Sequence, residues 1–471
     1  MRAKERNVAL ICLDSVREDV FRKYARNLQE KADIKYTGCR AVSSWSVPSH
    51  ASMFTGKLPH QHGIHQYNQY LGSLEVEGTF LNEMPNHRKI GISANVYASS
   101  AYGFDKLFDA FIDIDAARNP RGLTIQEYGE GRDMFGFSKY LGYLKESLSH
   151  DYPMASIGNG IFSQLKNWSN SKSIPQIVDD GAKVIARETQ YITDNEPYFL
   201  FANFMDAHWP LTPVRGFNHA IHNAPYDWSS EDYLPNGDRV DNVEDQSLSQ
   251  YQSLYAASIE YLDRVVSELI DDLLSQSDHP TTIIITSDHG DNLGKTTDNN
   301  LLGHKASMTE GLLHVPLLII SPPPSKSGEP VQVDGLVSHT DLSDLVIGLT
   351  DGEVADLRRN SVAGERIGSN LPARVNEDSE EADWWKRLIR VVYENDRKYQ
   401  WDSTGERYVY ECDSEQVNHQ ALIGDEFEFE KLDSKWFSTP IGEYARQSSQ
   451  NSGSHKISNT TKDRLERLGY R

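Results

Sequence analysis

The chain has 471 residues, with 69 Asp and Glu against 47 Lys and Arg, and a formal net charge of -22 at pH 7. This excess of negative charge argues against a general nucleic-acid binder or an anionic-membrane binder, because both partners are polyanions. The acidic residues are spread along the chain, a distribution expected both for ordinary solubilising charge and for adaptation to high salt. The length allows one large domain with a satellite or several medium domains.

The three cysteines, Cys12, Cys39 and Cys412, lie far apart and form no CxxC spacing. They therefore suggest neither a disulfide framework nor a zinc ribbon. The first residues lack the pattern of a signal peptide, and no stretch approaches the roughly 18 apolar residues that a membrane span needs. We expect a cytoplasmic protein without a membrane span.

Short apolar runs that end in polar residues and lead into helical patterns predict a mostly parallel sheet covered by helices on both faces. In chain order the runs are Asn7 to Leu13, Tyr198 to Phe204, Thr282 to Thr286 and Val315 to Ile320. The segment from Leu211 to Gln250 has no clear period and is expected to be a long ordered loop beside the substrate pocket. Apolar residues from Leu254 to Leu274 recur at a helical period and predict one long amphipathic helix.

The pattern changes past residue 385. Short β-rich runs separated by turn residues predict a small antiparallel sheet over 385–446. From 447 to 471 the chain is rich in Ser, Asn and Gly, which predicts a tail that is mobile in part.

Two of the predicted strands end in residue types that bind metals. Asp14 follows the first apolar run, and Asp288 and His289 follow the run that ends at Thr286. Because ligands in open α/β sheets gather at the carboxyl ends of the strands, these side chains are candidates for a cation site. Helix capping by Asp14 and bracing of a turn by the Asp288–His289 pair are the structural alternatives.

Ser46 is the candidate nucleophile. Pro48 is favourable in a first helical turn and Gly56 suits a helix end, so Ser46 is expected at a helix N-terminus. Free backbone N–H groups there stabilise an alkoxide or an anionic substrate. A plain N-cap serine is the alternative.

Two further segments carry basic side chains next to predicted strands. His208 follows the run that ends at Phe204, and could donate a proton to a leaving-group oxygen. His304 and Lys305 place an imidazole and an ammonium group between the third and fourth apolar runs. A lone lysine is usually solvent-facing, so this pair supports a functional site only together with the other elements.

Taken in chain order, from Asn7 to about Thr350, these five elements resemble the sulfatase family within the alkaline phosphatase superfamily. Family members carry Cys-x-Pro-x-Arg, a following Thr-Gly, and then Pro-x-x-His-Gly. The corresponding residues here are Ser46-Val47-Pro48-Ser49-His50, Thr55-Gly56 and Pro59-His60-Gln61-His62-Gly63. The resemblance implies an α/β fold with an alkaline-phosphatase-like, mostly parallel sheet sandwiched by helices. It places the catalytic domain at 1–370 and a small antiparallel β subdomain at 385–446.

The resemblance also implies roles for individual residues. Asp14, Ser46, Asp288 and His289 would form the shell of one divalent metal ion. His208 and Lys305 would join Ser46 as catalytic residues, and the substrate-binding residues would be Asn95, His304 and His50. Oxygen and imidazole ligands fit calcium, magnesium, manganese or zinc, and His289 favours manganese or zinc.

Two departures from the family pattern bear on the substrate. His50 stands where formylglycine sulfatases have the arginine needed to convert the nucleophile to an aldehyde, which puts that conversion in doubt. Asp14-Ser15 and Asp288-His289 replace the Asp-Asp and Asp-Asn pairs of sulfate-specialised members, and resemble the phosphonate monoester hydrolase and phosphodiesterase side.

The expected function is hydrolysis of an anionic sulfate or phosphate ester, with a substrate that could be carbohydrate-linked. Phosphate is chemically favoured if Ser46 remains serine, because an unmodified serine lacks the geminal hydroxyl that expels sulfate. The alternatives are a transferase that passes a phospho-group to a glycan or lipid head group, and a catalytically silent member of the fold.

Overall fold

The computed structural model describes residues 5–450 except for 116–120, 126–127, 129–135, 170–175, 177–178, 193–195, 236, 242, 277, 324–329, 373, 395 and 413–415, together with 457–458, 461–462 and 465. Among these residues the larger sheet has eight strands in the order β10-β2-β9-β6-β1-β5-β3-β4. Along the sheet these are β10 (Val331–Ser338), β2 (Ile34–Arg40), β9 (Leu317–Ile320), β6 (Thr281–Thr286), β1 (Asn7–Leu13), β5 (Tyr198–Phe204), β3 (Arg88–Ser93) and β4 (Ala110–Asp113).

The sheet is mostly parallel, as expected. Strand β1 lies between β5 and β6 and is parallel to both. Strand β9 was expected from the Val315 to Ile320 run, but it runs antiparallel to β6 and β2. An apolar run carries no information about strand direction. Here the chain arrives from the short helix α11 (Glu310–Leu313), beside the carboxyl end of β6, and crosses the sheet towards the opposite edge.

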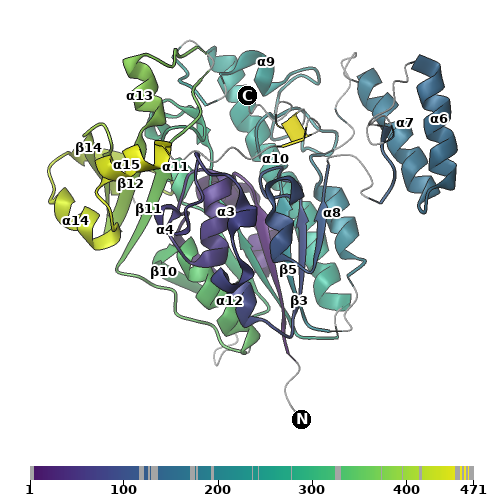
Figure 1. The fold of residues 1–471 in the computed structure, drawn as a ribbon, viewed down its shortest axis with the longest axis horizontal. Coiled ribbons are helices and arrows are strands. Elements are labelled where there is room, and N and C mark those ends of the chain that lie inside the picture. The colour runs from purple at the N-terminus through teal and green to yellow at the C-terminus, as the bar shows by residue number, and fades with distance from the viewer. Residues whose placement is uncertain are drawn as a thin grey trace.

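Helices cover both faces of this sheet (Figure 1). Alternate residues of β1 enter two cores: Ala9, Ile11 and Leu13 enter one, whereas Val8, Leu10 and Cys12 enter the other. The first core is closed by α1 (Glu18–Tyr24), α2 (Arg26–Lys31), α8 (Ala182–Thr189) and α10 (Asp245–Gln276). The second is closed by α3 (Ser46–Thr55) and α12 (Leu342–Thr350). Burial of both strand faces explains why β1 reads as a continuous apolar run.

The expected long helix is α10, which begins before the predicted start at Leu254. The described residues of 211–244 form an irregular loop that contains the short helix α9 (Ser230–Tyr233), and α10 begins at Asp245, inside the predicted loop. Other elements are α4 (Pro59–His62), α6 (Gly136–Ser149), α7 (Pro153–Ser169), α13 (Glu380–Lys386), β7 (Asn292–Leu293) and β8 (Leu302–Gly303). Short 3-10 helices are Leu71–Ser73, Val76–Gly78, Phe80–Glu83, Ser100–Tyr102, Phe104–Leu107, Thr296–Asp298 and His339–Asp341. No helix among the described residues is long and apolar enough to cross a membrane.

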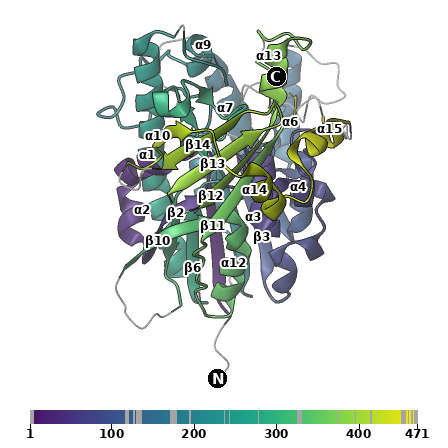
Figure 2. The ribbon, with the colours of Figure 1, turned by 90° about the vertical axis from the view of Figure 1, so that its left-hand side faces the viewer.

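A second, antiparallel sheet packs beside the first (Figure 2). Its strands, in order, are β11 (Ser361–Ile367), β12 (Leu388–Glu394), β13 (Arg397–Asp402), β14 (Arg407–Cys412) and β15 (Gln420–Gly424). This sheet begins at Ser361, ahead of the start predicted at 385, because β11 pairs with β12 across an intervening segment that contains α13.

Two helices, α14 (Phe429–Trp436) and α15 (Ile441–Gln450), follow the small sheet. The predicted tail at 447–471 therefore starts inside α15. Most of the remaining tail lies outside the described residues.

Candidate active site

Asp14 lies at the carboxyl end of β1 in the middle of the sheet. Its backbone N–H donates to the Phe204 carbonyl at 2.9 Å, which extends the pairing of β1 with β5 to the site itself. Ser15 then turns the chain with a φ of 62°, and its hydroxyl donates to Asp14 Oδ1 at 2.9 Å. The Asp14 side chain is completely buried, and burial next to Asp288 raises the pKa of its carboxyl group.

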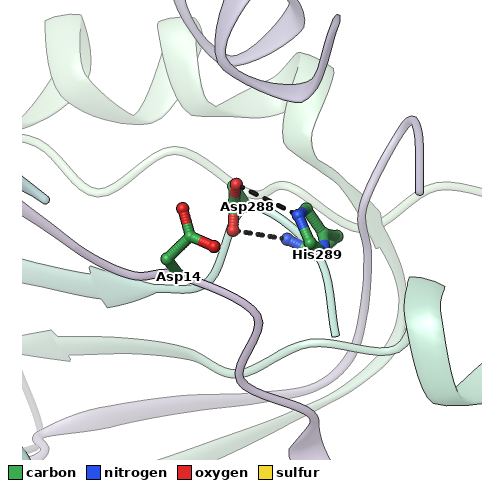
Figure 3. A group of neighbouring side chains, drawn as sticks. All are labelled: Asp14, Asp288 and His289. Carbon is green, nitrogen blue, oxygen red and sulfur yellow. Dashed lines mark hydrogen bonds and ion pairs between the residues drawn. The ribbon is translucent and has the colours of Figure 1, made fainter. Parts of the chain in front are cut away.

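Asp288 and His289 follow β6, the neighbour of β1, so the two strand ends meet. Ligand atoms of Asp14, Asp288 and His289 all lie within 4.8 Å of one another, and the three side chains point towards a common centre (Figure 3). The Ser15 N–H donates to Asp288 Oδ1 at 3.2 Å, whereas Asp288 Oδ2 is buried without a hydrogen-bond partner among the described residues. An orphaned buried carboxylate oxygen is costly unless a cation or donor meets it.

His289 is held in the form that binds metals. Its Nδ1 lies 2.7 Å from the Gly290 carbonyl oxygen, which can only accept, so Nδ1 carries the proton and Nε2 carries the lone pair. Burial lowers the pKa of His289 to about 4, which keeps the ring neutral near pH 7. Two carboxylates and a neutral imidazole are a donor set that fits a divalent cation.

Ser46 is the first residue of α3, and its hydroxyl points into this cluster. Ser46 Oγ lies 3.4 Å from Asp14 Oδ2 and 3.3 Å from His289 Nε2. The N-cap position belongs to Trp45, and no side chain caps the helix. The Ser46 hydroxyl is therefore not used as a helix cap, and the free N–H groups of the first turn of α3 lie beside it.

Asn95, two residues after β3, completes the same cluster from the far side of β5. Its Nδ2 group donates to Asp14 Oδ2 at 2.6 Å and to Ser46 Oγ at 3.0 Å. Its Oδ1 accepts from the Tyr97 N–H at 2.7 Å, so the amide orientation is fixed by the backbone that follows.

His50 lies one helical turn after Ser46 and is completely buried. Its Nδ1 donates to the Ser46 carbonyl oxygen at 2.7 Å, and its Nε2 faces Asn203 Nδ2 at 3.4 Å. Nδ1 is also 3.8 Å from Asp288 Oδ2. Both ring nitrogens face protein atoms, so the structure places His50 behind Ser46 and not on an open substrate surface.

His208 and His304 form one side of the site. The ring of His304 lies 4.7 Å from that of His289 and 5.3 Å from that of His208, measured between centroids. His208 Nδ1 donates to the Trp209 carbonyl oxygen at 2.5 Å. His304 Nδ1 faces Asp291 Oδ1 at 3.4 Å, and Asp291 Oδ2 accepts from the Tyr251 hydroxyl at 2.7 Å.

Lys305 follows His304 but turns towards a different segment. Its side chain packs on Gly237, where a Cβ atom would come within 2.3 Å of Lys305 Cδ. It forms no hydrogen bond or ion pair with any residue that the structure describes. Burial and the nearby Arg366 lower the pKa of its ammonium group. The structure therefore brings His304 next to His289 and His208, and leaves Lys305 beside the loop that contains Gly237.

Arg366 was not foreseen from the sequence. It comes from β11 and is almost fully buried, and its Nη1 donates to Ser44 Oγ at 2.7 Å and to the His304 carbonyl oxygen at 2.9 Å. No carboxylate pairs with it among the described residues, and its Nε group there has no hydrogen-bond partner. Burial, together with Arg387, lowers the pKa of the guanidinium group to about 9. The one signal in the sequence is the pair of charges, Glu365 and Arg366, inside an otherwise β-like run.

Arg17, also unforeseen, braces the loop that follows Asp288 and His289. Its Nη1 donates to the Asp291 carbonyl oxygen and to Asp298 Oδ2, each at 2.9 Å. Its Nε pairs with Asp19 Oδ1 at 2.7 Å. The neighbouring carboxylates raise the pKa of this buried guanidinium group.

Comparison with known proteins identifies the family. The model of the sulfatase family matches residues 6–352. An uncharacterized sulfatase, YidJ of Escherichia coli (strain K12), is 26% identical over 183 residues, which are 37% of this chain and 35% of that protein. The chain thus matches about a third of the length of this curated relative.

Solved structures share the fold at low identity. The structure of BT4656 in complex with its substrate D-glucosamine-2-N,6-O-disulfate is 15% identical, with a TM-score of 0.58, and the match covers 95% of this chain and 99% of that one. Phosphonate monoester hydrolase of Agrobacterium radiobacter is 14% identical, with a TM-score of 0.57 and coverage of 95% and 96%. With the family model matching most of the chain, the protein belongs to the sulfatase family.

Proposed function

We propose that this protein is a metal-dependent hydrolase of an anionic ester, and that Ser46 is its nucleophile. The observation that carries the proposal is the position of Ser46 Oγ, which reaches Asp14, His289 and Asn95 instead of capping α3. Asp14, Asp288 and His289 would hold one divalent ion, and the imidazole ligand favours manganese or zinc over calcium or magnesium. When bound, such an ion lowers the pKa of the serine hydroxyl and neutralises charge on the ester oxygens.

The chain's own residues supply the remaining steps. Ser46 Oγ attacks phosphorus or sulfur and the bond to the leaving alcohol oxygen breaks, while Asn95 Nδ2 holds the attacking Oγ and the first N–H groups of α3 bind the charged oxygens. His208 uses Nδ1 to bond a protein oxygen, and His304 turns Nδ1 towards Asp291, so that Nε2 in each ring carries the lone pair. These nitrogens would take up the proton of the nucleophile and return one to the leaving oxygen. Water then attacks the seryl ester and releases the anion.

His50 favours a Ser46 that is not converted to formylglycine. In our proposal it is a positioning residue, because its Nδ1 holds the Ser46 carbonyl and its Nε2 faces Asn203. Lys305 is proposed to act on the substrate only indirectly, through the positive potential it shares with Arg366. With unmodified serine, a phosphate ester is the favoured substrate.

Arg366 supports an anionic substrate. A buried guanidinium group is normally paired with a carboxylate, and a substrate anion would meet this one beside His304. We propose a carbohydrate as the alcohol part of the substrate, with the D-glucosamine disulfate bound by BT4656 as the guide. The small sheet would then serve the catalytic domain by presenting Arg366 from β11.

The test uses the full chain, loaded separately with manganese, zinc, calcium or magnesium. Turnover of an aryl phosphate monoester, a phosphodiester and an aryl sulfate is measured together with intact mass. Ser46→Ala should abolish turnover, whereas Ser52→Ala on the same helix is the matched control, because Ser52 Oγ contacts His62 away from the metal ligands.

Phosphate-ester turnover at unmodified mass establishes direct serine catalysis. Sulfate turnover with a mass loss of about 2 Da, as expected for oxidation of serine to formylglycine, would overturn the preference for phosphate. Turnover retained in Ser46→Ala would remove Ser46 as the nucleophile. Turnover that appears only with an added acceptor alcohol would identify a transferase.

A further inference from the structure

A cavity of about 440 Å³ lies at the junction of the two sheets, apart from the candidate active site. Its walls come from the middle of β2 and β10 on one side and from β12 and β14 on the other, with α1 at one end. Figure 2 shows the small sheet crossing this part of the large one. None of the residues that line it is a proposed metal ligand, the nucleophile, or His208 or His304. The volume falls in the usual range of small-molecule sites.

Three arginines line this cavity in a protein with a strongly negative net charge. Arg22 Nε lies 2.6 Å from Glu18 and Arg40 Nη2 lies 3.0 Å from Glu310, whereas Arg359 Nη2 lies 2.8 Å from Asp341 and 3.6 Å from Asp344. A guanidinium group has five N–H donors, so these contacts leave part of its capacity unused.

Arg40 supplies the observation that points to a ligand. Its side chain is nine-tenths buried, and its Nε group has no hydrogen-bond partner among the described residues. A buried charged donor left unpaired is costly to the folded chain. The guanidinium carbon of Arg40 lies 5.1 Å from the centre of the Tyr393 ring, which forms part of the wall. Arg40 itself lines the cavity, so an anion there would meet its guanidinium group.

The wall also contains acceptors for hydroxyl groups. Asp334 and Asp396 both line the cavity. Asp334 Oδ1 accepts from Thr37 Oγ1 at 2.9 Å and from Gln332 Nε2 at 3.0 Å, which holds its carboxylate in place. Carboxylates next to arginines suit a ligand that has both an anionic group and hydroxyl donors, and they disfavour a bare polyanion.

The cavity touches the elements that build the active site. Arg40 ends β2, and the chain after it leads directly to Ser46 at the start of α3. Glu310, its partner, begins α11, and in this helix the Leu312 carbonyl accepts from the N–H of Gly290, next to His289. A ligand that moved Arg40 would act on both the nucleophile segment and the metal-ligand loop.

We propose that this cavity is a second binding site, for a small hydroxylated molecule that carries a phosphate or sulfate group. Arg22, Arg40 and Arg359 bind the tetrahedral anion, and Asp334 and Asp396 accept hydroxyl groups. This site does not depend on the hydrolase proposal, because binding here involves neither the metal ligands nor Ser46.

Isothermal titration calorimetry of the full chain tests the proposal with four probes: inorganic phosphate, inorganic sulfate, glucose 6-phosphate and glucose 6-sulfate. Titrations are done in the Ser46→Ala background, which prevents turnover, and again after metal chelation. We expect glucose 6-phosphate or glucose 6-sulfate to bind without metal and more tightly than its inorganic anion. The sugar ester that binds with the higher affinity shows whether the site prefers phosphate or sulfate.

The double variant Arg22→Gln/Arg359→Gln should weaken this binding at least tenfold, since two charge-assisted contacts to the anion are lost. Arg358→Gln is the matched control, because Arg358 is exposed, pairs with Asp356 and does not line the cavity. Leu336→Trp, which fills the cavity without removing a charge, should also abolish binding and serves if the double variant does not fold.

The proposal would be overturned if the folded double variant and Leu336→Trp both bound the sugar ester as tightly as the chain without these substitutions. The absence of metal-independent binding of any probe, or equal loss of binding in Arg358→Gln, would also overturn it. Failure of Ser46 as nucleophile would leave these titrations unchanged, which keeps the two proposals separable.

Discussion

The amide nitrogen of Asn95 lies 3.0 Å from Ser46 Oγ, although 49 positions separate the two residues in the chain. The same nitrogen donates to Asp14 at 2.6 Å, so one amide orients both the proposed nucleophile and a proposed metal ligand. This donor is already in place before any substrate arrives, which is the condition for electrostatic stabilisation of a transition state.

Asn95→Ala should lower kcat by about 100-fold or more, the usual effect of removing one preorganised donor. Asn95→Asp should do at least as much harm, because a carboxylate cannot donate and would add a negative charge beside Asp14. Steady-state kinetics with the best ester substrate provide the measurement, and circular dichroism checks the fold. A change in KM alone, with kcat preserved, would contradict the role assigned to Asn95.

Metal removal should lower stability through the two buried carboxylates. Asp14 and Asp288 repel each other without a cation between them, and Asp288 Oδ2 has no hydrogen-bond partner among the described residues. Free metal at 100 times its Kd stabilises the folded chain by about 2.7 kcal/mol. We therefore expect chelation to lower the Tm of the wild type.

Asp288→Asn separates this effect from general damage. The metal-free variant should be at least as stable as the metal-free wild type, because one of the two buried charges is gone. Added manganese or zinc should raise its Tm little. Differential scanning calorimetry with and without chelator decides the matter, and an equal metal-induced shift in both proteins would rule out Asp288 as a ligand.

Arg366→Gln should weaken the use of a dianionic substrate more than that of a monoanionic one. The substitution keeps hydrogen-bonding capacity but removes the positive charge beside His304. We expect kcat/KM for a phosphate monoester to fall by about 10- to 100-fold, as for the loss of a charge-assisted hydrogen bond, with a smaller effect on a phosphodiester. Arg358→Gln is the exposed control. An equal loss for both esters would indicate that Arg366 only supports Ser44 and the His304 loop.

Glu18→Gln should change how stability depends on pH. Burial raises the pKa of Glu18 to about 7, against the opposing effect of Arg22 on α1 and Arg40 on β2, and Asp19 adds to the rise. Its Oε2 atom has no hydrogen-bond partner among the described residues. Between pH 4.5 and pH 7 the folded chain then binds more protons at this site than the unfolded chain, so the wild type loses stability there as pH rises.

The glutamine variant lacks this loss. The difference in free energy of unfolding, variant minus wild type, should therefore increase by roughly 1–3 kcal/mol as the pH rises from 4.5 to 8. Urea unfolding at both pH values measures the difference. Parallel curves for the two proteins would show that Glu18 is charged in the folded state throughout this range.

Much of the central sheet is predictable because β1, β5 and β6 are buried on both faces and read as apolar runs. The convergence of Asp14, Asp288 and His289 follows from strand ends that share one edge. What a run of apolar residues cannot encode is direction or partner. For that reason β9 was expected without its antiparallel orientation.

The part of the site contributed by the small sheet was less accessible. β11 pairs with β12 across an intervening segment that contains α13, and a local pattern does not reveal such long-range pairing. Arg366 reaches the proposed site only because β11 lies against the segment that carries Ser44. Lys305 shows a second limit of prediction from the sequence. Its position next to His304 in the chain did not determine where its side chain points.

The central position of β1 has a consequence for how the protein is made. This first strand forms its ladders with Tyr198–Phe204 and Thr281–Thr286, so its two neighbours leave the ribosome long after it does. Pairing across such separations is slow, because chain closure precedes any stabilising contact. The proposed metal ligands come from both ends of that span, so the proposed metal site can form only after β6 has been synthesised and paired. Metal would then bind late in synthesis, only after the middle of the central sheet has formed.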